Sequence, residues 1–115
     1  MAFGPKKPDF DLGSELEFEE YSPLLRELKP KLRPDSKEIP QNFGGKSWYV
    51  LQDPITLQFY RVAETEHEIL GRLDGTTTLG EIHDGLIAQF HGEAPSFRDL
   101  AHFVFMLRHS NLLVP

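Results

Sequence analysis

The chain has 115 residues, enough for one ordinary domain and too few for two. Its formal net charge of -6 disfavours nucleic-acid binding, because gripping a polyphosphate backbone normally needs a basic face. The lack of cysteine excludes disulfides, thiolate metal sites and a cysteine nucleophile. No apolar run approaches the roughly 20 residues that span a bilayer, and the N-terminus lacks a signal-peptide core. We therefore expect a cytoplasmic segment without direct membrane contact.

Residues 1–36 are rich in charge and proline and are expected to form an acidic tail outside the core. Ser22-Pro23 is typical of a helix start, with serine as the N-cap, and predicts a short helix near residues 23–29. In the stretch from Glu15 to Glu19, carboxylates alternate with Leu16 and Phe18. This stretch is either a solvated linker or a strand with both apolar residues on one face. As a strand it could dock within the chain or exchange between two chains, which would give a homodimer through the tail.

Two β-prone runs follow, at residues 48–51 and 57–62, and turn residues including Asp53-Pro54 separate them. They predict a hairpin. Residues 37–43 are also extended in character, although Pro40 confines them to a sheet edge or a bulge. We expect them to form an additional N-terminal strand of the sheet.

Both faces of the predicted hairpin carry apolar side chains. If Gln52 and Leu57 flank the turn, Val50 pairs with Phe59, and Trp48 pairs with Arg61 on the same face. The opposite face carries Tyr49, Leu51, Tyr60 and Val62. One face must meet the helices, and periodicity alone does not choose between them.

Three helices are predicted after the hairpin, at residues 64–73, 78–91 and 96–110. Asp74-Gly75 ends the first, and Thr78 with Glu81 forms a capping box for the second. Ser96 caps the third, which has a continuous apolar face. The residues expected in the core are Phe59 or Tyr60, Leu70, Leu73, Ile82, Leu86, Leu100, Val104 and Leu107. The elements together predict an α+β fold, a small antiparallel sheet packed on three α-helices.

Four short motifs occur in this part of the chain: YVLQDPIT at 49–56, FYRV at 59–62, LGRLDG at 70–75 and TLGEI at 78–82. Together they resemble the PqqD-like family, whose members are also called RiPP recognition elements and bind leader peptides. The resemblance implies that residues 37–115 form a winged helix-turn-helix domain. It also implies that a peptide adds as an extra strand to the edge strand at 57–62, in a groove beside the third helix. The stretch LRPD at 32–35 is similar to the variant found ahead of site-2-protease-like membrane zinc metallopeptidases, which implies a regulatory N-terminal part of a larger protein.

The third predicted helix carries an aromatic residue outside its apolar arc. Phe105 falls there beside two arginines and a small residue, as a groove for an apolar and acidic peptide would require. Alternatively, Phe105 packs under the tail or the hairpin. The candidate peptide-binding residues, including two from the edge strand, are Phe59, Arg61, Arg98, Ala101, Phe105 and Arg108.

No catalytic, cofactor or metal motif is found. His67-Glu68 begins a zinc-protease motif, but Gly71 stands where the second histidine is required. We therefore expect a non-catalytic module without cofactor or metal that presents a peptide or protein segment to an enzyme partner or a fused enzyme domain. The rival interpretation is a winged-helix DNA-binding domain. It is disfavoured because Arg98 and Arg108 are the firm cations of the third helix, against eight acids in residues 1–36.

Overall fold

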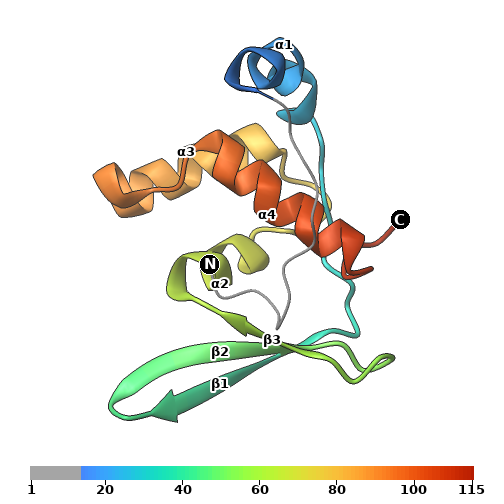
Figure 1. Cartoon of the computed structure of the whole chain (residues 1–115), viewed down its shortest axis with the longest axis vertical. Coiled ribbons are helices and arrows are strands. Elements are labelled where there is room, and N and C mark those ends of the chain that lie inside the picture. The colour runs from blue at the N-terminus through green and yellow to red at the C-terminus, as the bar shows by residue number, and fades with distance from the viewer. Residues whose placement is uncertain (1–13) are drawn as a thin grey trace.

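The computed structural model describes residues 14–115, with the sheet as one layer and the helices stacked on one side of it (Figure 1). The strands are β1 (Lys37–Phe43), β2 (Lys46–Gln52) and β3 (Phe59–Val62), antiparallel in the order β1-β2-β3. The helices are α1 (Glu15–Leu25), α2 (Glu64–Gly71), α3 (Leu79–Phe90) and α4 (Phe97–His109), with a short 3-10 turn, η1 (His91–Glu93). The predicted α+β class is confirmed, and the strand expected at 37–43 is present.

The β2–β3 hairpin turns through a longer loop than the sequence predicted. Val50 pairs with Arg61 and Gln52 with Phe59, so the predicted pairing of Val50 with Phe59 is wrong by two residues. Asp53 causes the difference, because its backbone N–H donates to the Gln58 carbonyl at 3.0 Å and its carbonyl accepts from Leu57 N at 2.8 Å. Since side chains alternate with a period of two, the shift leaves each residue on its predicted face.

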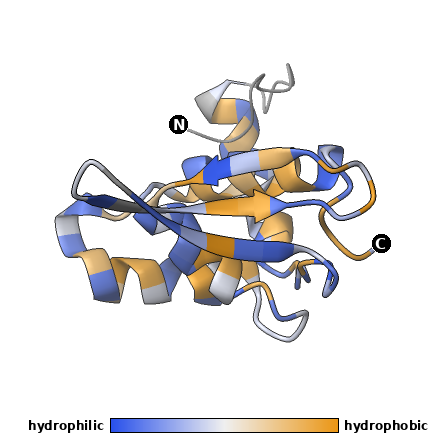
Figure 2. Cartoon of the chain, turned by 90° about the horizontal axis from the view of Figure 1, so that it is seen from below, coloured by the Kyte–Doolittle hydropathy of each residue, from blue (hydrophilic) through white to orange (hydrophobic). Residues whose placement is uncertain are grey.

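The sheet packs on the helices through Tyr49, Leu51, Tyr60 and Val62. Leu51, Tyr60 and Val62 are buried, while Tyr49 is half-buried and stacks on the His67 ring of α2, with centroids 3.8 Å apart. The other face, which carries the exposed Phe59 and Arg61, is turned away from the helices. Figure 2 views the molecule from this outer side of the sheet.

Helix α4 lies at the centre of the core. More than half of its residues are buried, namely Phe97, Leu100, Ala101, Phe103, Val104, Met106 and Leu107. The predicted capping box of α3 is confirmed by reciprocal bonds between Thr78 and Glu81 of 3.0 and 3.1 Å. The predicted core residues are buried: Tyr60, Leu70, Leu73, Ile82, Leu86, Leu100, Val104 and Leu107.

Helix α1 corrects the prediction for the tail. The helix expected near 23–29 lies at Glu15–Leu25, so the linker and strand interpretations of the stretch from residue 15 to 19 are both wrong. Ser14 is the N-cap and accepts from Glu17 N at 3.2 Å. Proline has no backbone N–H to donate to the Glu19 carbonyl. Pro23 is tolerated inside the helix because the Ser22 hydroxyl donates to that carbonyl instead, at 3.4 Å.

The segment between α1 and β1 is hydrogen-bonded to the rest of the chain. The carbonyls of Arg26 and Leu28 accept from Gly80 N at 3.0 Å and Leu79 N at 2.8 Å, which satisfies free donors at the start of α3. Further along, Arg33 N donates to the Leu112 carbonyl at 2.9 Å. Residues 26–33 are therefore part of the folded unit.

Candidate functional site

Strand β3 forms an edge of the sheet. Within residues 14–115 it pairs on one side only, with β2. The hydrogen bond from Asp53 N to Gln58 O continues the β2–β3 register, so these two residues form a hydrogen-bonded pair. In an antiparallel ladder, hydrogen-bonded pairs alternate with pairs whose backbone groups point away from each other. The backbone groups of Tyr60 and Val62 therefore point to β2, whereas those of Phe59 and Arg61 point to the outer edge.

The side chains at this edge are aromatic and cationic. Phe59 is 54 % exposed, and the Arg61 guanidinium lies over the Trp48 ring of β2 with 4.2 Å from Cζ to the centroid. This contact holds a positive charge in place on the outer face of the sheet. The edge can therefore offer backbone hydrogen bonds, an apolar surface and one oriented cation.

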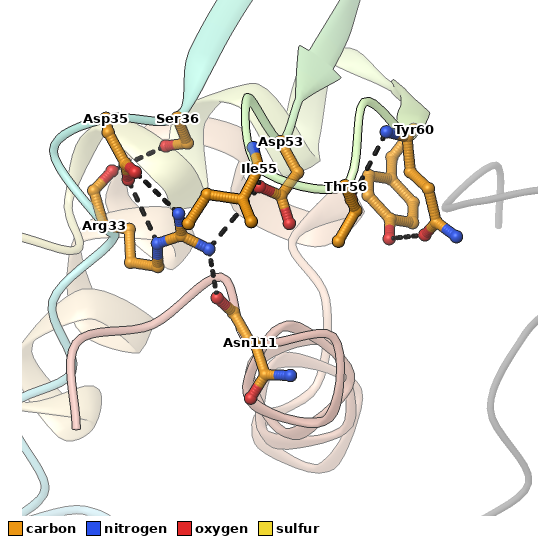
Figure 3. A network of polar contacts seen from close by, with 9 residues as sticks. Arg33, Asp35, Ser36, Asp53, Ile55, Thr56, Tyr60 and Asn111 are labelled. Atoms are coloured by element: carbon orange, nitrogen blue, oxygen red, sulfur yellow. Dashed lines mark hydrogen bonds and ion pairs between the residues drawn. The ribbon is translucent and has the colours of Figure 1, made fainter.

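The β2–β3 loop beside this edge is held by a polar network around Arg33 (Figure 3). The Arg33 side chain donates to the Asn111 carbonyl at 2.8 Å and to both carboxylate oxygens of Asp35 at 3.0 and 2.6 Å. It also lies 3.5 Å from the buried carboxylate of Asp53. The hydrogen bond from Arg33 lowers the pKa of Asp35, and the same bond raises the pKa of Arg33. The stretch LRPD that resembled the metallopeptidase variant thus supplies the ion pairs that position this loop.

Arg98 and Ala101 of α4 lie against other parts of the chain. Arg98 Cζ is 5.3 Å from the centroid of the Phe18 ring, and its Nη1 donates to the Ser14 carbonyl at 3.3 Å, so Arg98 contacts α1. Ala101 is fully buried. Helix α1 therefore lies at the end of α4 where Arg98 was expected to face a peptide.

Phe105 and Arg108 line a cavity of about 460 Å³ on α4. Leu28, Lys29 and Pro30 also line it, together with residues 104, 111 and 113–115. Half-buried Phe105 thus lies beside the N-terminal segment, which agrees with the alternative that it packs under the tail. The cavity is mainly apolar, with the cations Lys29 and Arg108 in its lining.

The six candidate residues are divided among separate surfaces. Phe59 and Arg61 share the β3 edge, Phe105 and Arg108 share the cavity, Arg98 faces α1 and Ala101 is in the core. Sequence reasoning missed Ile55 and Leu57, which are exposed beside Phe59. The alternation of apolar residues at 55, 57 and 59 was the available signal, but the proline-containing turn concealed it.

Two of the histidines, His67 and His83, contact polar groups elsewhere in the fold. His67 Nδ1 contacts a Glu38 carboxylate oxygen, and His83 Nε2 lies 3.0 Å from the Pro95 carbonyl. Across the described part of the chain, no group of three or more histidines and carboxylates could hold a metal ion. No helix in this part of the chain is long and apolar enough to cross a membrane.

One comparison with known proteins identifies a family. The sequence profile described as "Coenzyme PQQ synthesis protein D (PqqD)" matches residues 49–113, which include most of the β2–β3 hairpin and all of α2, α3 and α4. No curated protein and no solved structure gives a significant match.

Proposed function

The chain belongs to the PqqD family, whose domains are non-catalytic binding modules for a peptide substrate or a partner protein, and we propose that it binds an extended peptide along the edge of β3. The peptide would add to the sheet as a fourth strand. Its backbone would bond to the outward groups of Phe59 and Arg61. The domain would then present the peptide to an enzyme, either a partner or a fused domain.

The observation that carries this proposal is the orientation of the β3 backbone. Phe59 and Arg61 direct their N–H and C=O groups outward, while Tyr60 and Val62 complete the ladder with β2. An incoming strand can therefore bond to this edge without disturbing the existing sheet. The Arg61 guanidinium, oriented by Trp48, favours a peptide with a carboxylate at the neighbouring position.

Backbone bonds alone are too few for tight binding. Phe59 and Arg61 each offer one donor and one acceptor, so the edge provides four groups. At about 1 kcal/mol net for each hydrogen bond, they supply about half of the ~8 kcal/mol of a micromolar complex. Peptide side chains must supply the rest. Phe105 and Arg108 lie on a separate surface, so they are secondary contacts, available only to a peptide that extends from the β3 edge to their mainly apolar cavity.

The DNA-binding alternative is weaker. The helix that would enter the major groove is α4, and most of α4 is buried in the core. Its two arginines are turned to α1 and to the cavity. A net charge of -6 adds to the argument against a phosphate-binding face.

The test compares Arg61→Pro with Arg61→Ala. Proline removes the outward N–H without touching the β2 ladder, and an edge strand tolerates it because the preceding residue is already extended. Peptides would be selected on the 115-residue chain from a phage-displayed library of random 12-residue sequences. Their affinity would be measured by fluorescence anisotropy after circular dichroism has confirmed the fold of each variant.

Arg61→Ala reports the contribution of the guanidinium alone and is the matched control. We expect Arg61→Pro to weaken binding at least tenfold beyond Arg61→Ala, through the lost bond and the obstructing ring. Equal affinities of the two variants, with both correctly folded, would show that the peptide does not pair with β3.

A further inference from the structure

Three large apolar side chains stand in solvent at alternate positions beside the edge of β3. Ile55 is 73 % exposed, Leu57 is 65 % exposed and Phe59 is 54 % exposed. The residues between them, Thr56 and Gln58, are uncharged. Single exposed leucines are common, but three large exposed apolar residues within five positions, here called the strip, are typical of an interaction surface.

The backbone at the centre of this strip is strained. Leu57 has a φ of 61°, a left-handed conformation that glycine adopts freely and a leucine disfavours. Strain of this kind persists only where the surroundings enforce it, and it is concentrated at functional sites. A leucine at this position places a large side chain outside the fold, where it adds nothing to the core.

The surroundings that enforce the conformation are the bonds made by Asp53. Its carboxylate accepts from Ile55 N at 3.0 Å, and its carbonyl accepts from Leu57 N at 2.8 Å. The carboxylate is buried and compensated by Arg33, which is anchored in turn by Asp35 and the Asn111 carbonyl. The loop is therefore a preorganised platform, and little ordering would be needed when a ligand binds it.

The same bonds end the sheet next to the strip. The Leu57 N–H already donates to the Asp53 carbonyl and cannot donate to a peptide. The row of outward backbone groups that a peptide could pair with therefore ends at Phe59. A peptide that runs past Phe59 must leave the ladder and can contact Ile55 and Leu57 through its side chains. The loop offers no charge there, so the matching side chains are apolar.

We propose that Ile55 and Leu57 are specificity-determining residues, which select peptides with two large apolar residues, two positions apart, directly outside the segment paired with β3. This inference rests on the proposed function and adds the class of ligand to it. The preferred peptide has a short strand with a carboxylate opposite Arg61, flanked on the Phe59 side by the apolar pair. Neither flanking residue needs backbone bonds to the protein.

The experiment uses the full chain, the same 12-residue phage library and the variants Leu57→Gly, Ile55→Ser and Leu24→Ser. Leu24 is the matched control, because it is 75 % exposed but lies on α1. Wild type and Leu24→Ser should enrich peptides with the apolar pair, and Leu57→Gly should lose that enrichment. Wild-type peptides should bind Leu57→Gly and Ile55→Ser about tenfold more weakly, as expected for losing one buried aliphatic contact.

Leu57→Gly separates binding from folding. Glycine relieves the left-handed strain, so this variant should not lower the melting temperature even though it lowers affinity. Ile55→Ser is the second variant because it removes an apolar side chain without changing the residue at φ 61°.

Two results would overturn the inference. If wild-type peptides bind Leu57→Gly and Ile55→Ser unchanged but remain sensitive to Arg61→Pro, the loop does not select the ligand and the β3 proposal stands. If they are insensitive to Arg61→Pro as well, the β3 proposal and the inference fail together.

Discussion

Replacing Phe18 by alanine should weaken the docking of α1 on the domain. The Phe18 ring is buried, 6.0 Å from the centroid of the Phe97 ring and 5.4 Å from that of Tyr21, and the Arg98 guanidinium lies over it. Burial of a phenylalanine side chain contributes about 1.5–3 kcal/mol, and the remaining cavity raises the usual cost of Phe→Ala to about 3–5 kcal/mol. Because α1 lies at the periphery and can shift to close a cavity, we expect a loss of about 3 kcal/mol, near the lower limit.

Urea unfolding followed by circular dichroism measures this loss, and amide hydrogen exchange locates it. A loss of 3 kcal/mol in the docking of α1 corresponds to roughly 10²-fold faster exchange in the helix. Leu16→Ala is the control, since Leu16 lies on the same helix but is exposed, and it should cost less than about 0.5 kcal/mol. If Phe18→Ala and Leu16→Ala have the same effect on stability and exchange, the reasoning that Phe18 anchors α1 is refuted.

Two further predictions concern α3 and the turn that precedes it. Leu86→Ala should lower the free energy of unfolding by about 2–5 kcal/mol because Leu86 is fully buried, and a loss below about 0.5 kcal/mol would contradict the assigned face of α3. Hydrogen bonds from the backbone of Thr76 and Thr77 lower the pKa of Asp74 to about 2 from the ordinary 3.8. A carboxyl group whose pKa is lowered in the folded state stabilises the fold at pH values above its unfolded pKa, and this stabilisation is lost as the pH falls to the folded pKa. The difference in melting temperature between wild type and Asp74→Ala should therefore be full at pH 6 and shrink as the pH falls from 3.8 towards 2. A difference that is constant from pH 6 to pH 2.5 would show that Asp74 acts without its charge.

The elements predicted most accurately are those set by local interactions. The start of α3 follows from Thr78 and Glu81, which bond to each other across one turn and can be recognised from spacing alone. The burial of Leu86 follows from helical periodicity, which is also local. These features need no knowledge of distant parts of the chain.

The errors arose where distant residues decide the local conformation. The length of the β2–β3 loop depends on the buried carboxylate of Asp53, whose compensating cation, Arg33, comes from the segment before β1. Helix α1 depends on Phe18 packing against Phe97 of α4. Pro23 suggested that a helix begins there, but the Ser22 hydroxyl donates to the Glu19 carbonyl and lets the helix run through Pro23. Neither pairing can be recognised by spacing along the sequence.

The candidate site was predicted only in part, because distant segments also decide what surrounds its residues. The edge position of β3 was expected from the family resemblance and agrees with the strand order, and Phe59 and Arg61 lie on its exposed face. The candidate residues of α4 were grouped by their angle around the helix axis. This angle predicts the side of the helix on which a side chain lies, but not which part of the chain packs against that side. For Phe105 that neighbour is the stretch at Leu28 and Pro30, which the sequence presented as part of a tail.

The bonds between the segment before β1 and the end of the chain have a consequence for the order of folding. Leu32 bridges to Leu113, and Val114 N donates to the Lys31 carbonyl at 2.8 Å, so these contacts enclose all three strands and three of the helices. Bringing such distant residues together requires closing a long loop, whose entropic cost is lowest once the intervening elements have become compact. We therefore expect the hairpin and the α3–α4 pair to form first and this closure to come last, so that the arriving N-terminal segment caps α3 and fixes the β2–β3 loop in one late step.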